Sequence, residues 1–270
     1  AGARGRAIGP EGGAAETVAG GRVGKAGGAT VLSVGKGVAS TRARESGDVI
    51  YTLAGPESAV ATTKAFSAQL AVVYLLALRF ARAVGSALAR RESELCEQLL
   101  HLPAQIESLL SLDDDMAALA RQFAAAKQVF FIGRGLDYAI ALEGSLKLKE
   151  ISYLQSEAYA AGELKHGTIS LIEEGTPVIA VATQDALFEK TLGNIKEVRA
   201  RGARVIALVS EDNTEIRSLV DYVIPVPQTD AMLKPSTDVI ALQLGDYSMA
   251  LERGCDVDKY RNLAKSVTVE

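Results

Sequence analysis

The sequence predicts an α/β protein in which parallel sheets carry helices on both faces, giving three-layer αβα domains. From residue 128 onward, continuous apolar runs of four or five residues alternate with longer segments of helical apolar spacing. Such runs are typical of strands buried on both faces, and the helices between them supply the crossovers that parallel strands need. Two shorter β-branched runs, near residues 30 and 50, indicate a smaller part of the same kind. We therefore expect two α/β domains, the first of them incomplete.

The first half of the chain divides into a Gly- and Ala-rich start, two strands and long helices. Residues 1–28 bury little and lose much backbone entropy on ordering, so we expect them to contribute least to the fold. The next expected elements are strands at Thr30–Val34 and Val49–Leu53 and a helix over Thr63–Ala83. Residues 86–126 indicate further helix, broken at Pro103 and restarting at Ser111.

The second half is expected to form one regular domain. The predicted elements are strand Val129–Ile132, helix Tyr138–Ser152, strand Val178–Ala182, helix Leu187–Arg201, strand Val205–Val209, short helix Glu215–Val220, strand Val223–Val226 and helix Thr237–Arg253. Ligands of parallel α/β sheets bind beyond the carboxyl ends of the strands, so the loops there are the expected place for a site.

Four parts are expected along the chain. Residues 1–84 form the end of a first domain, and residues 85–126 form connecting helices. Residues 127–255 form the second domain, and residues 256–270 form a tail whose Ser-Val-Thr-Val ending suits packing. The chain begins with Ala and no leader pattern follows, so we expect it to be a piece of a longer protein.

Composition excludes several classes of protein. Hydrophobic residues make up 48% and charged residues 23%, an ordinary balance for a globular chain. The net charge is −4 and the basic residues are scattered, which argues against nucleic-acid binding. Polar residues interrupt the most apolar stretch, Phe66–Ala89, so we expect a core helix and no membrane span.

Cysteine and histidine usage points to a reduced, metal-free protein. Cys96 and Cys255 stand in unrelated contexts without metal-ligand spacing, which favours free thiols and a cytoplasmic location. His101 and His166 are the only histidines, so a multi-histidine metal site is excluded. We expect no metal and no cofactor.

A glycine turn at Gly133-Arg134-Gly135 follows one predicted strand and precedes a helix. Such a turn can present backbone N–H groups to an anion, or it can be a tight turn without a ligand. The dinucleotide fingerprint needs a third glycine where Tyr138 stands, so a nicotinamide cofactor is disfavoured.

Three charged residues share one face of the helix that follows. Glu143 and Lys147 are four apart, and Lys147 and Glu150 three apart. A lysine beside two carboxylates could tune a general base in a pocket, or the three could be a solvated row of ion pairs.

Two further residues could be catalytic or could have an ordinary structural role. His166 precedes a glycine in a predicted loop and could act as a general acid near neutral pH, or be structural. Lys265 lies inside the apolar tail and could form an imine, or be a surface lysine.

Together these stretches resemble the second sugar isomerase (SIS) domain of glucosamine-6-phosphate synthases, also called glutamine–fructose-6-phosphate aminotransferases (isomerizing). The matching segments are 133–135, 141–153, 157–167 and 262–270, with a further match at 54–57 and 60–66. The resemblance covers the chain from about residue 38 to the end.

The resemblance implies an enzyme, specifically the isomerase part of such a synthase. This part is made of two sugar isomerase domains and converts fructose 6-phosphate and ammonia to glucosamine 6-phosphate, by imine formation and aldose–ketose isomerisation. The ammonia comes from glutamine, hydrolysed by a separate glutaminase domain of the full-length chain. The family implies a homodimer that works without metal or nucleotide cofactor.

The family's motif also implies roles for single residues. Glu150 resembles the base that moves a proton between two sugar carbons, supported by Lys147 and Glu143. His166 resembles the ring-opening histidine, which in the family reaches the site from the neighbouring subunit. Lys265 resembles the tail lysine that forms an imine with the open-chain sugar.

Substrate contacts are expected from Val60, Thr62 and Ala264, which lie in matching segments although Thr62 replaces the usual serine. The family's phosphate loop reads Ser-Gln-Ser-Gly-Glu-Thr. The corresponding stretch here, residues 9–14, lacks hydroxyl donors, and Glu11 would add a negative charge. The strands that should precede this loop also look absent. Whether this chain turns over by itself is therefore left open.

Two other functions stay open beside the enzyme. A non-catalytic, sugar-phosphate-binding SIS domain would need neither a base nor a tail lysine. A structural piece that only dimerises would bind no sugar phosphate.

Overall fold

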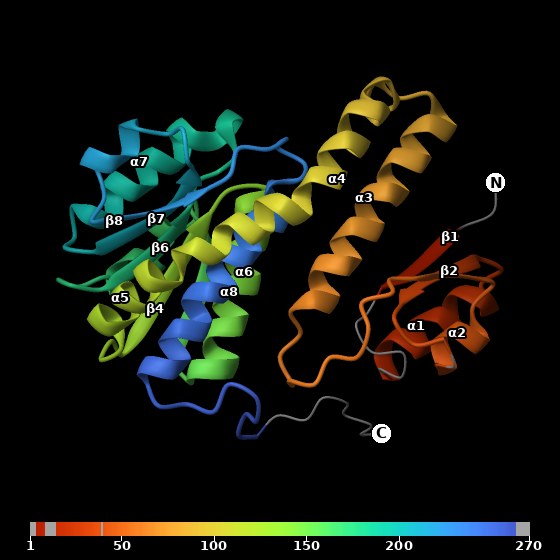
Figure 1. Ribbon diagram of the computed structural model, residues 1–270, viewed down its shortest axis with the longest axis horizontal. Coiled ribbons are helices and arrows are strands. Elements are labelled where there is room, and N and C mark those ends of the chain that lie inside the picture. Colours follow the sequence, from red (N-terminus) through yellow and green to blue (C-terminus); the bar gives the residue numbers. More distant parts are fainter. Residues whose placement is uncertain (1–3, 9–14, 39, 263–270) are drawn as a thin grey trace. The chain divides into compact units, whose positions relative to one another are not determined.

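The computed structural model describes residues 4–8, 15–38 and 40–262 of the chain (Figure 1). The chain divides into two compact units. The first comprises the described residues up to Ser93 together with 258–262, and the second runs from Glu94 to Val257. Both units contain parallel strands and helices, so the predicted α/β class is confirmed.

The first unit contains a three-stranded parallel sheet in the order β1-β2-β3. Its elements are β1 (Arg4–Ile8), α1 (Ala15–Ala26), β2 (Thr30–Gly35), α2 (Thr41–Glu45), β3 (Asp48–Tyr51), α3 (Lys64–Val84) and a short 3₁₀ helix, η1 (Ala87–Arg91). The strands predicted near residues 30 and 50 and the long helix after residue 63 are confirmed.

The expectations that residues 1–28 contribute least to the fold and that no strand precedes residues 9–14 are wrong, because β1 and α1 both form. Strand β1 pairs with β2, and α1 packs beside that sheet. A methyl group added at Gly21 or Gly24 would make an ordinary van der Waals contact with the Val31 side chain, at 3.8 or 3.6 Å, so α1 packs on β2 at a normal distance. Residues 9–14, between β1 and α1 in the sequence, lie outside the described residues.

Helix α3 begins where the Glu57 carboxylate accepts hydrogen bonds from the Thr63 N–H, at 2.7 Å, and from its hydroxyl, at 3.2 Å. It is long and apolar enough to cross a membrane, and only 17% of its most apolar 18-residue window is buried. Core helices of globular proteins pass the same length test, so the prediction of a core helix stays a prediction.

Two helices, α4 (Glu92–Leu109) and α5 (Asp113–Phe123), lead into the second unit and are joined by the 3₁₀ turn η2 (Leu110–Leu112). The predicted restart near Ser111 is confirmed, but the predicted break at Pro103 is wrong. Leu95, Leu102 and Leu109 are buried at seven-residue intervals, and exposed Pro103 lies off that face, where water can satisfy the carbonyl that loses its partner.

The second unit is built on a five-stranded parallel sheet in the order β5-β4-β6-β7-β8. Its strands are β4 (Gln128–Gly133), β5 (Gln155–Ala160), β6 (Pro177–Val181), β7 (Arg204–Ser210) and β8 (Tyr222–Val226). Its other elements are α6 (Leu136–Ser152), η3 (Leu164–His166), η4 (Thr168–Leu171), η5 (Asp185–Leu187), α7 (Phe188–Arg199), η6 (Glu215–Ser218) and α8 (Lys234–Glu252).

The predicted elements of this unit are confirmed. Strand β5 is an additional element that the sequence did not predict. Strand β5 pairs with β4 at the sheet edge, with Ser156 opposite Val129. Its residues Gln-Ser-Glu-Ala-Tyr-Ala form no apolar run, because an edge strand is only partly covered. The short helix predicted at 215–220 is a 3₁₀ turn, η6.

Both faces of the sheet are covered (Figure 1). Alternate strand residues point to opposite faces. Phe130 and Ile132 of β4 belong to the core that includes Leu192 and Ile195 of α7. On the other face, helices α5, α6 and α8 pack together against the sheet, with Val129 turned toward them.

A buried polar network ties the carboxyl ends of β4 and β6 to α8. Asp137, in the first turn of α6, accepts hydrogen bonds from the backbone N–H groups of Thr183 (3.1 Å) and Gln184 (3.2 Å). The Thr183 hydroxyl oxygen lies 2.8 Å from Asp137 Oδ1 and 2.7 Å from Asp238 Oδ2. A hydroxyl has one proton to donate, so one of the two carboxyls must itself donate.

Asp238 is the carboxyl that keeps its proton. Burial raises the pKa of Asp137 too, but Asp137 accepts two backbone N–H groups, which favour its ionised form. Burial, together with the charge of Asp137, raises the pKa of Asp238 to about 8, against the lowering effects of the Thr183 hydrogen bond and Lys234. Lys234, fully buried, completes the network by donating to the Thr183 carbonyl and, at 3.0 Å, to Asp185 Oδ1.

We predict that Asp238→Asn flattens the pH dependence of stability. The pKa of Asp238 is raised on folding, so its stabilising contribution is complete below the unfolded value of about 3.9 and is lost as the pH rises through about 8. Urea unfolding at pH 5, 6.5 and 8 should show a steeper fall in the free energy of unfolding for the parent chain than for the variant. Equal slopes would contradict the assignment of the proton.

Candidate functional site

A tight turn places α6 directly against the end of β4. A Cβ added at Gly133 would lie 2.6 Å from the backbone of Asp137, and Gly135 adopts a φ of +58°. The glycine turn that both interpretations of Gly133-Arg134-Gly135 require is present. The Arg134 guanidinium donates to Asn194 Oδ1 of α7, which fixes the turn from the other face.

The three charged residues predicted on one face of α6 do come together. Lys147 Nζ lies 2.6 Å from Glu150 Oε2 and 3.7 Å from Glu143 Oε1. Lys147 is only 6% exposed, so a solvated row of ion pairs does not describe this cluster. Burial raises the pKa of Glu143; the Lys147 charge lowers it and the Glu150 charge raises it.

Close packing of α6 on α8 brings a fourth ionisable group to this cluster. A Cβ added at Gly144 would lie 2.7 Å from Leu242 Cδ1 of α8 and 3.1 Å from Phe131 Cε1 of β4. At this approach the charges of Glu143 and Lys147 act on Asp246, a buried residue of α8. The sequence reading missed Asp246, although a carboxylate within an apolar helix pattern could have marked it.

His166 is placed on a separate element from the α6 cluster. It ends η3, beyond β5, and its side chain is 64% exposed. Its Nε2 lies 4.0 Å from Glu163 Oε2, a contact that is ionic only when the imidazole is protonated.

The other expected site residues belong to the first unit or lie outside the described residues. Val60 and Thr62 are partly buried in the loop that precedes α3. Ala264 and Lys265 lie outside the described residues.

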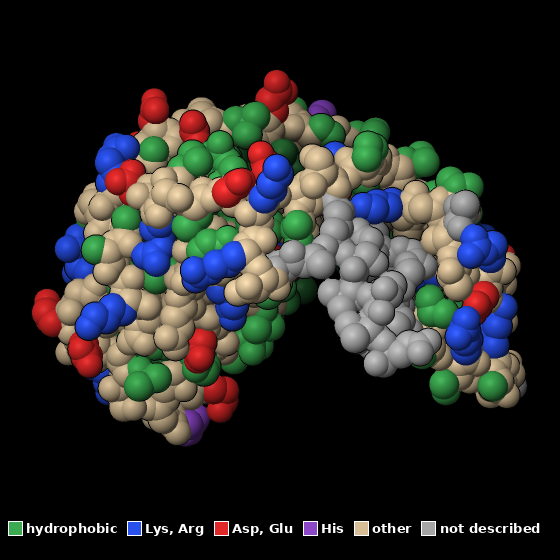
Figure 2. Space-filling model, turned by 90° about the horizontal axis from the view of Figure 1, so that it is seen from below, with side chains coloured by type: hydrophobic (Ala, Val, Ile, Leu, Met, Phe, Trp, Pro, Cys, Tyr) green, Lys and Arg blue, Asp and Glu red, His purple; other side chains and the backbone are tan. Residues whose placement is uncertain are grey.

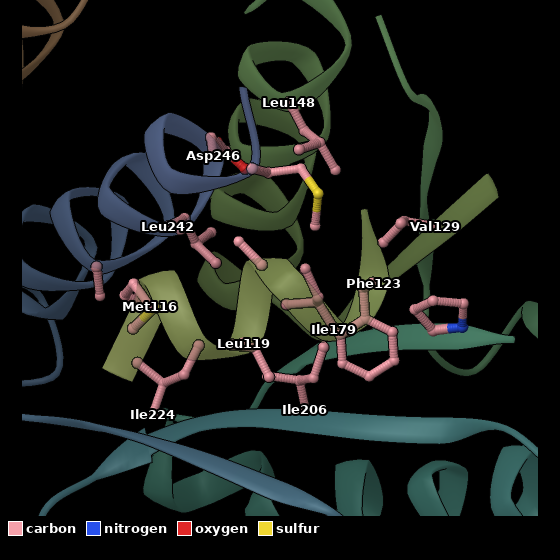
Figure 3. Close-up of a pocket in the computed structure, with 15 residues that line it drawn as sticks. Met116, Leu119, Phe123, Val129, Leu148, Ile179, Ile206, Ile224, Leu242 and Asp246 are labelled. Carbon is pink, nitrogen blue, oxygen red and sulfur yellow. The ribbon is translucent and has the colours of Figure 1, made fainter. Parts of the chain in front are cut away.

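The described residues contain one small apolar cavity beside the cluster and no metal-binding group. The cavity measures about 40 Å³ and lies between the sheet and helices α5, α6 and α8, with Asp246 in its wall (Figure 3). No three His, Cys, Asp or Glu side chains among the described residues are placed to hold a metal ion. Figure 2 shows basic and acidic side chains interspersed over the surface of the second unit.

We predict that Lys147→Met destabilises the chain at neutral pH by about 1–3 kcal/mol, because two partly buried carboxylates lose their partner. The raised pKa of Glu143 should rise further, so the loss should shrink as the pH falls and the carboxylates take up protons. Urea unfolding at pH 7 and pH 5 measures both effects. The matched control is Lys149→Met, an exposed lysine of the same helix, which should change stability little. A pH-independent loss would contradict the role of Lys147 as counterion.

Comparison with known protein families gives one match that spans both units. The SIS domain model matches residues 7–79 and 122–253.

Two curated relatives of the chain have the same name. The chain is 53% identical over 256 residues to the glutamine–fructose-6-phosphate aminotransferase (isomerizing) of Clostridium tetani, covering 95% of this chain and 42% of the relative. It is 52% identical, with the same coverage, to that of Caldanaerobacter subterraneus subsp. tengcongensis. The chain thus spans less than half the length of these curated relatives.

A solved structure shows which part of such a protein the chain matches. The C-terminal domain of glucosamine-fructose-6-phosphate aminotransferase from Francisella tularensis superposes with a TM-score of 0.88 at 34% identity. The match covers 94% of this chain and 72% of that one. These comparisons confirm the resemblance to the isomerase part of these proteins.

Proposed function

The chain belongs to the SIS domain family, and we propose that it performs the isomerase reaction of glucosamine 6-phosphate synthesis. In this proposal the substrates are fructose 6-phosphate and ammonia, and the product is glucosamine 6-phosphate. The names of the relatives support the substrate class, and the buried Glu143–Lys147–Glu150 cluster supports catalysis.

The proposed chemistry begins at the sugar carbonyl. Lys265 attacks C2 of the open-chain sugar and releases water to form an imine, and ammonia then displaces the lysine. An imine makes the neighbouring C1 proton more acidic, so a carboxylate can remove it. Glu150 takes that proton and delivers it to C2, while the proton of the C1 hydroxyl is lost and the nitrogen gains one, which leaves an aldehyde at C1 and an amine at C2.

The geometry of α6 suits this division of roles. Lys147 Nζ, 2.6 Å from Glu150 Oε2, orients the base and offers a positive charge to the oxygen of the developing enolamine. The Glu143 carboxylate, 3.7 Å from the same ammonium, holds it from the other side. His166 is assigned to ring opening, and Val60, Thr62 and Ala264 to substrate contacts.

Partners and location complete the proposal. The ammonia is supplied by a glutaminase domain of the full-length protein, and the chain acts as a homodimer. The exposure of His166 supports its service in a partner's site. The free thiols of Cys96 and Cys255 support a cytoplasmic location, and the interspersed surface charges support the absence of nucleic-acid binding.

A non-catalytic sugar-phosphate-binding domain is the second candidate. It is favoured only by residues 9–14, which lack the hydroxyl donors of the family's phosphate loop. Titration calorimetry with glucosamine 6-phosphate, beside an assay of fructose 6-phosphate conversion to glucose 6-phosphate, separates the two. Binding without turnover would favour the second candidate, and no binding would favour a purely structural role.

We predict that Glu150→Gln abolishes the conversion of fructose 6-phosphate to glucose 6-phosphate, because loss of a general base costs roughly 10²–10⁴-fold. The assay is run on this chain and on a version whose residues 9–14 read Ser-Gln-Ser-Gly-Glu-Thr. The replacement should raise turnover, since it restores phosphate donors. The control is Glu189→Gln, an exposed carboxylate on α7. Turnover by Glu150→Gln near the parent rate would remove Glu150 from the role.

A second prediction concerns the source of His166. Glu150→Gln and His166→Ala subunits, each inactive alone, should regain activity when mixed, because a hybrid dimer contains one intact site. Up to about half of the dimers are hybrid after free exchange of equal amounts, which sets the recovery to look for. Subunit exchange is followed separately by mass spectrometry of differently labelled chains. Exchange without recovery would mean that His166 acts within its own chain or has no catalytic role.

A further inference from the structure

Asp246 is a carboxyl enclosed in the core of the second unit. It lies on α8 and is 3% exposed, and its Oδ2 has neither a hydrogen-bond partner nor contact with solvent. An ionised carboxylate without a partner is very costly to bury, whereas a protonated one costs much less. The geometry of Asp246 therefore requires a proton on this side chain at neutral pH.

The groups that face Asp246 come from three sides. From α6, the Glu143 carboxylate and the Lys147 ammonium act on it electrostatically. From α5 and the sheet, the side chains that share its cavity carry no charge and include Met116, Phe123 and Ile179 (Figure 3). Lys147 is therefore the cation that an ionised Asp246 would attract.

We propose that Asp246 is a positioning residue for the α6 cluster. While Asp246 is protonated it carries no charge, so the Lys147 ammonium stays beside Glu150 and Glu143. When Asp246 loses that proton, it draws the ammonium away from Glu150 toward α8. The catalytic consequence rests on the proposed function, in which Glu150 is the base. The proton and its coupling to Lys147 are independent of any reaction.

The direction of the pH effect follows from the same contacts. Burial raises the pKa of Asp246 well above its ordinary value; the Glu143 charge raises it further and the Lys147 charge lowers it. Because the carboxyl is buried and its Oδ2 has no hydrogen-bond partner, we expect it to be neutral at neutral pH and to ionise only at higher pH. Ionisation competes for Lys147, so isomerisation should decline at alkaline pH earlier in the parent than in a chain without this carboxyl.

The first test measures the proton directly on the 270-residue chain. Infrared spectra at neutral pH should show the C=O stretch of protonated carboxyls, and Asp246→Asn should remove part of that band. Asp238→Asn, which removes the other buried acid of α8, should remove a different part. Should Asp246→Asn fail to fold, Asp246→Leu extends an apolar side chain toward the cavity instead. An unchanged band in a folded Asp246 variant would overturn the proposal.

The second test measures the coupling to Lys147. In chain labelled with ¹⁵N at lysine Nζ, the Lys147 resonance, identified by its loss in Lys147→Met, should shift on the alkaline side with the midpoint of the Asp246 band. That shift should disappear in Asp246→Asn and persist in Asp238→Asn. A shift that persists in Asp246→Asn would overturn the coupling.

The third test uses turnover and separates this inference from the proposed function. The alkaline limb of the pH profile of kcat/KM should move up by roughly half a pH unit or more in Asp246→Asn, and should stay in place in Asp238→Asn. An unmoved limb in an active variant would overturn the catalytic consequence. Absence of turnover in every chain would count against the proposed function, while the infrared and ¹⁵N results would still decide the role of Asp246.

Discussion

The close packing of α6 against β4 and α8 is the constraint on which the candidate site depends. A methyl group added at Gly144 would lie 2.7 Å from Leu242 and 3.1 Å from Phe131. The backbone of α6 therefore packs directly against side chains of α8 and β4. Glu143 and Lys147 lie on the same stretch of α6. Helical spacing sets the lysine beside the carboxylates, and the packing of α6 leaves the lysine only 6% exposed.

Buried charge is tolerated here because each group has a physical compensation. Lys147 has two carboxylates within 3.7 Å. Asp137 has backbone N–H donors from the end of β6, and Asp238 shares the Thr183 hydroxyl. Asp246 has no such partner in its cavity, and neutralisation by a proton is the compensation that remains to it. The two carboxyls of α8 thus reach the same neutral state by different routes.

Much of the fold and part of the site could be predicted from the sequence. Continuous apolar runs located β4, β6 and β7, because strands buried on both faces leave a signal in every residue, and the run of β8 located that edge strand as well. Strand β5 left none, since an edge strand that is only partly covered can be polar. Helix α1 was missed because its glycines lower the helix propensity, although the helix forms in contact with β1 and β2. Propensity is a local quantity, and in both cases a tertiary contact decided the outcome.

The site shows the same division between local and long-range information. Glu143, Lys147 and Glu150 lie within eight positions on one helix, so helical spacing alone placed them on one face. Spacing could not say whether that face met water or protein, because the burial of Lys147 depends on the packing of α6 against elements far along the chain, α8 among them. Asp246 was visible only as a carboxylate within an apolar helix pattern, because its relation to Glu143 exists only across the α6–α8 contact.

This dependence has a consequence for how the site can vary. The charges of the cluster lie on α6, whereas Asp246 lies on α8, so a change on α8 can act on the cluster without altering a residue that touches substrate. Removing the Asp246 carboxyl removes one titratable proton near Lys147. We expect the 2.6 Å contact between Lys147 and Glu150 to remain. Adding a methyl group at Gly144 would act through packing instead, because the Leu242 and Phe131 side chains would have to move while every ionisable group remains. The packing of α6 and the charge on α8 can therefore be changed separately, the first at Gly144 and the second at Asp246.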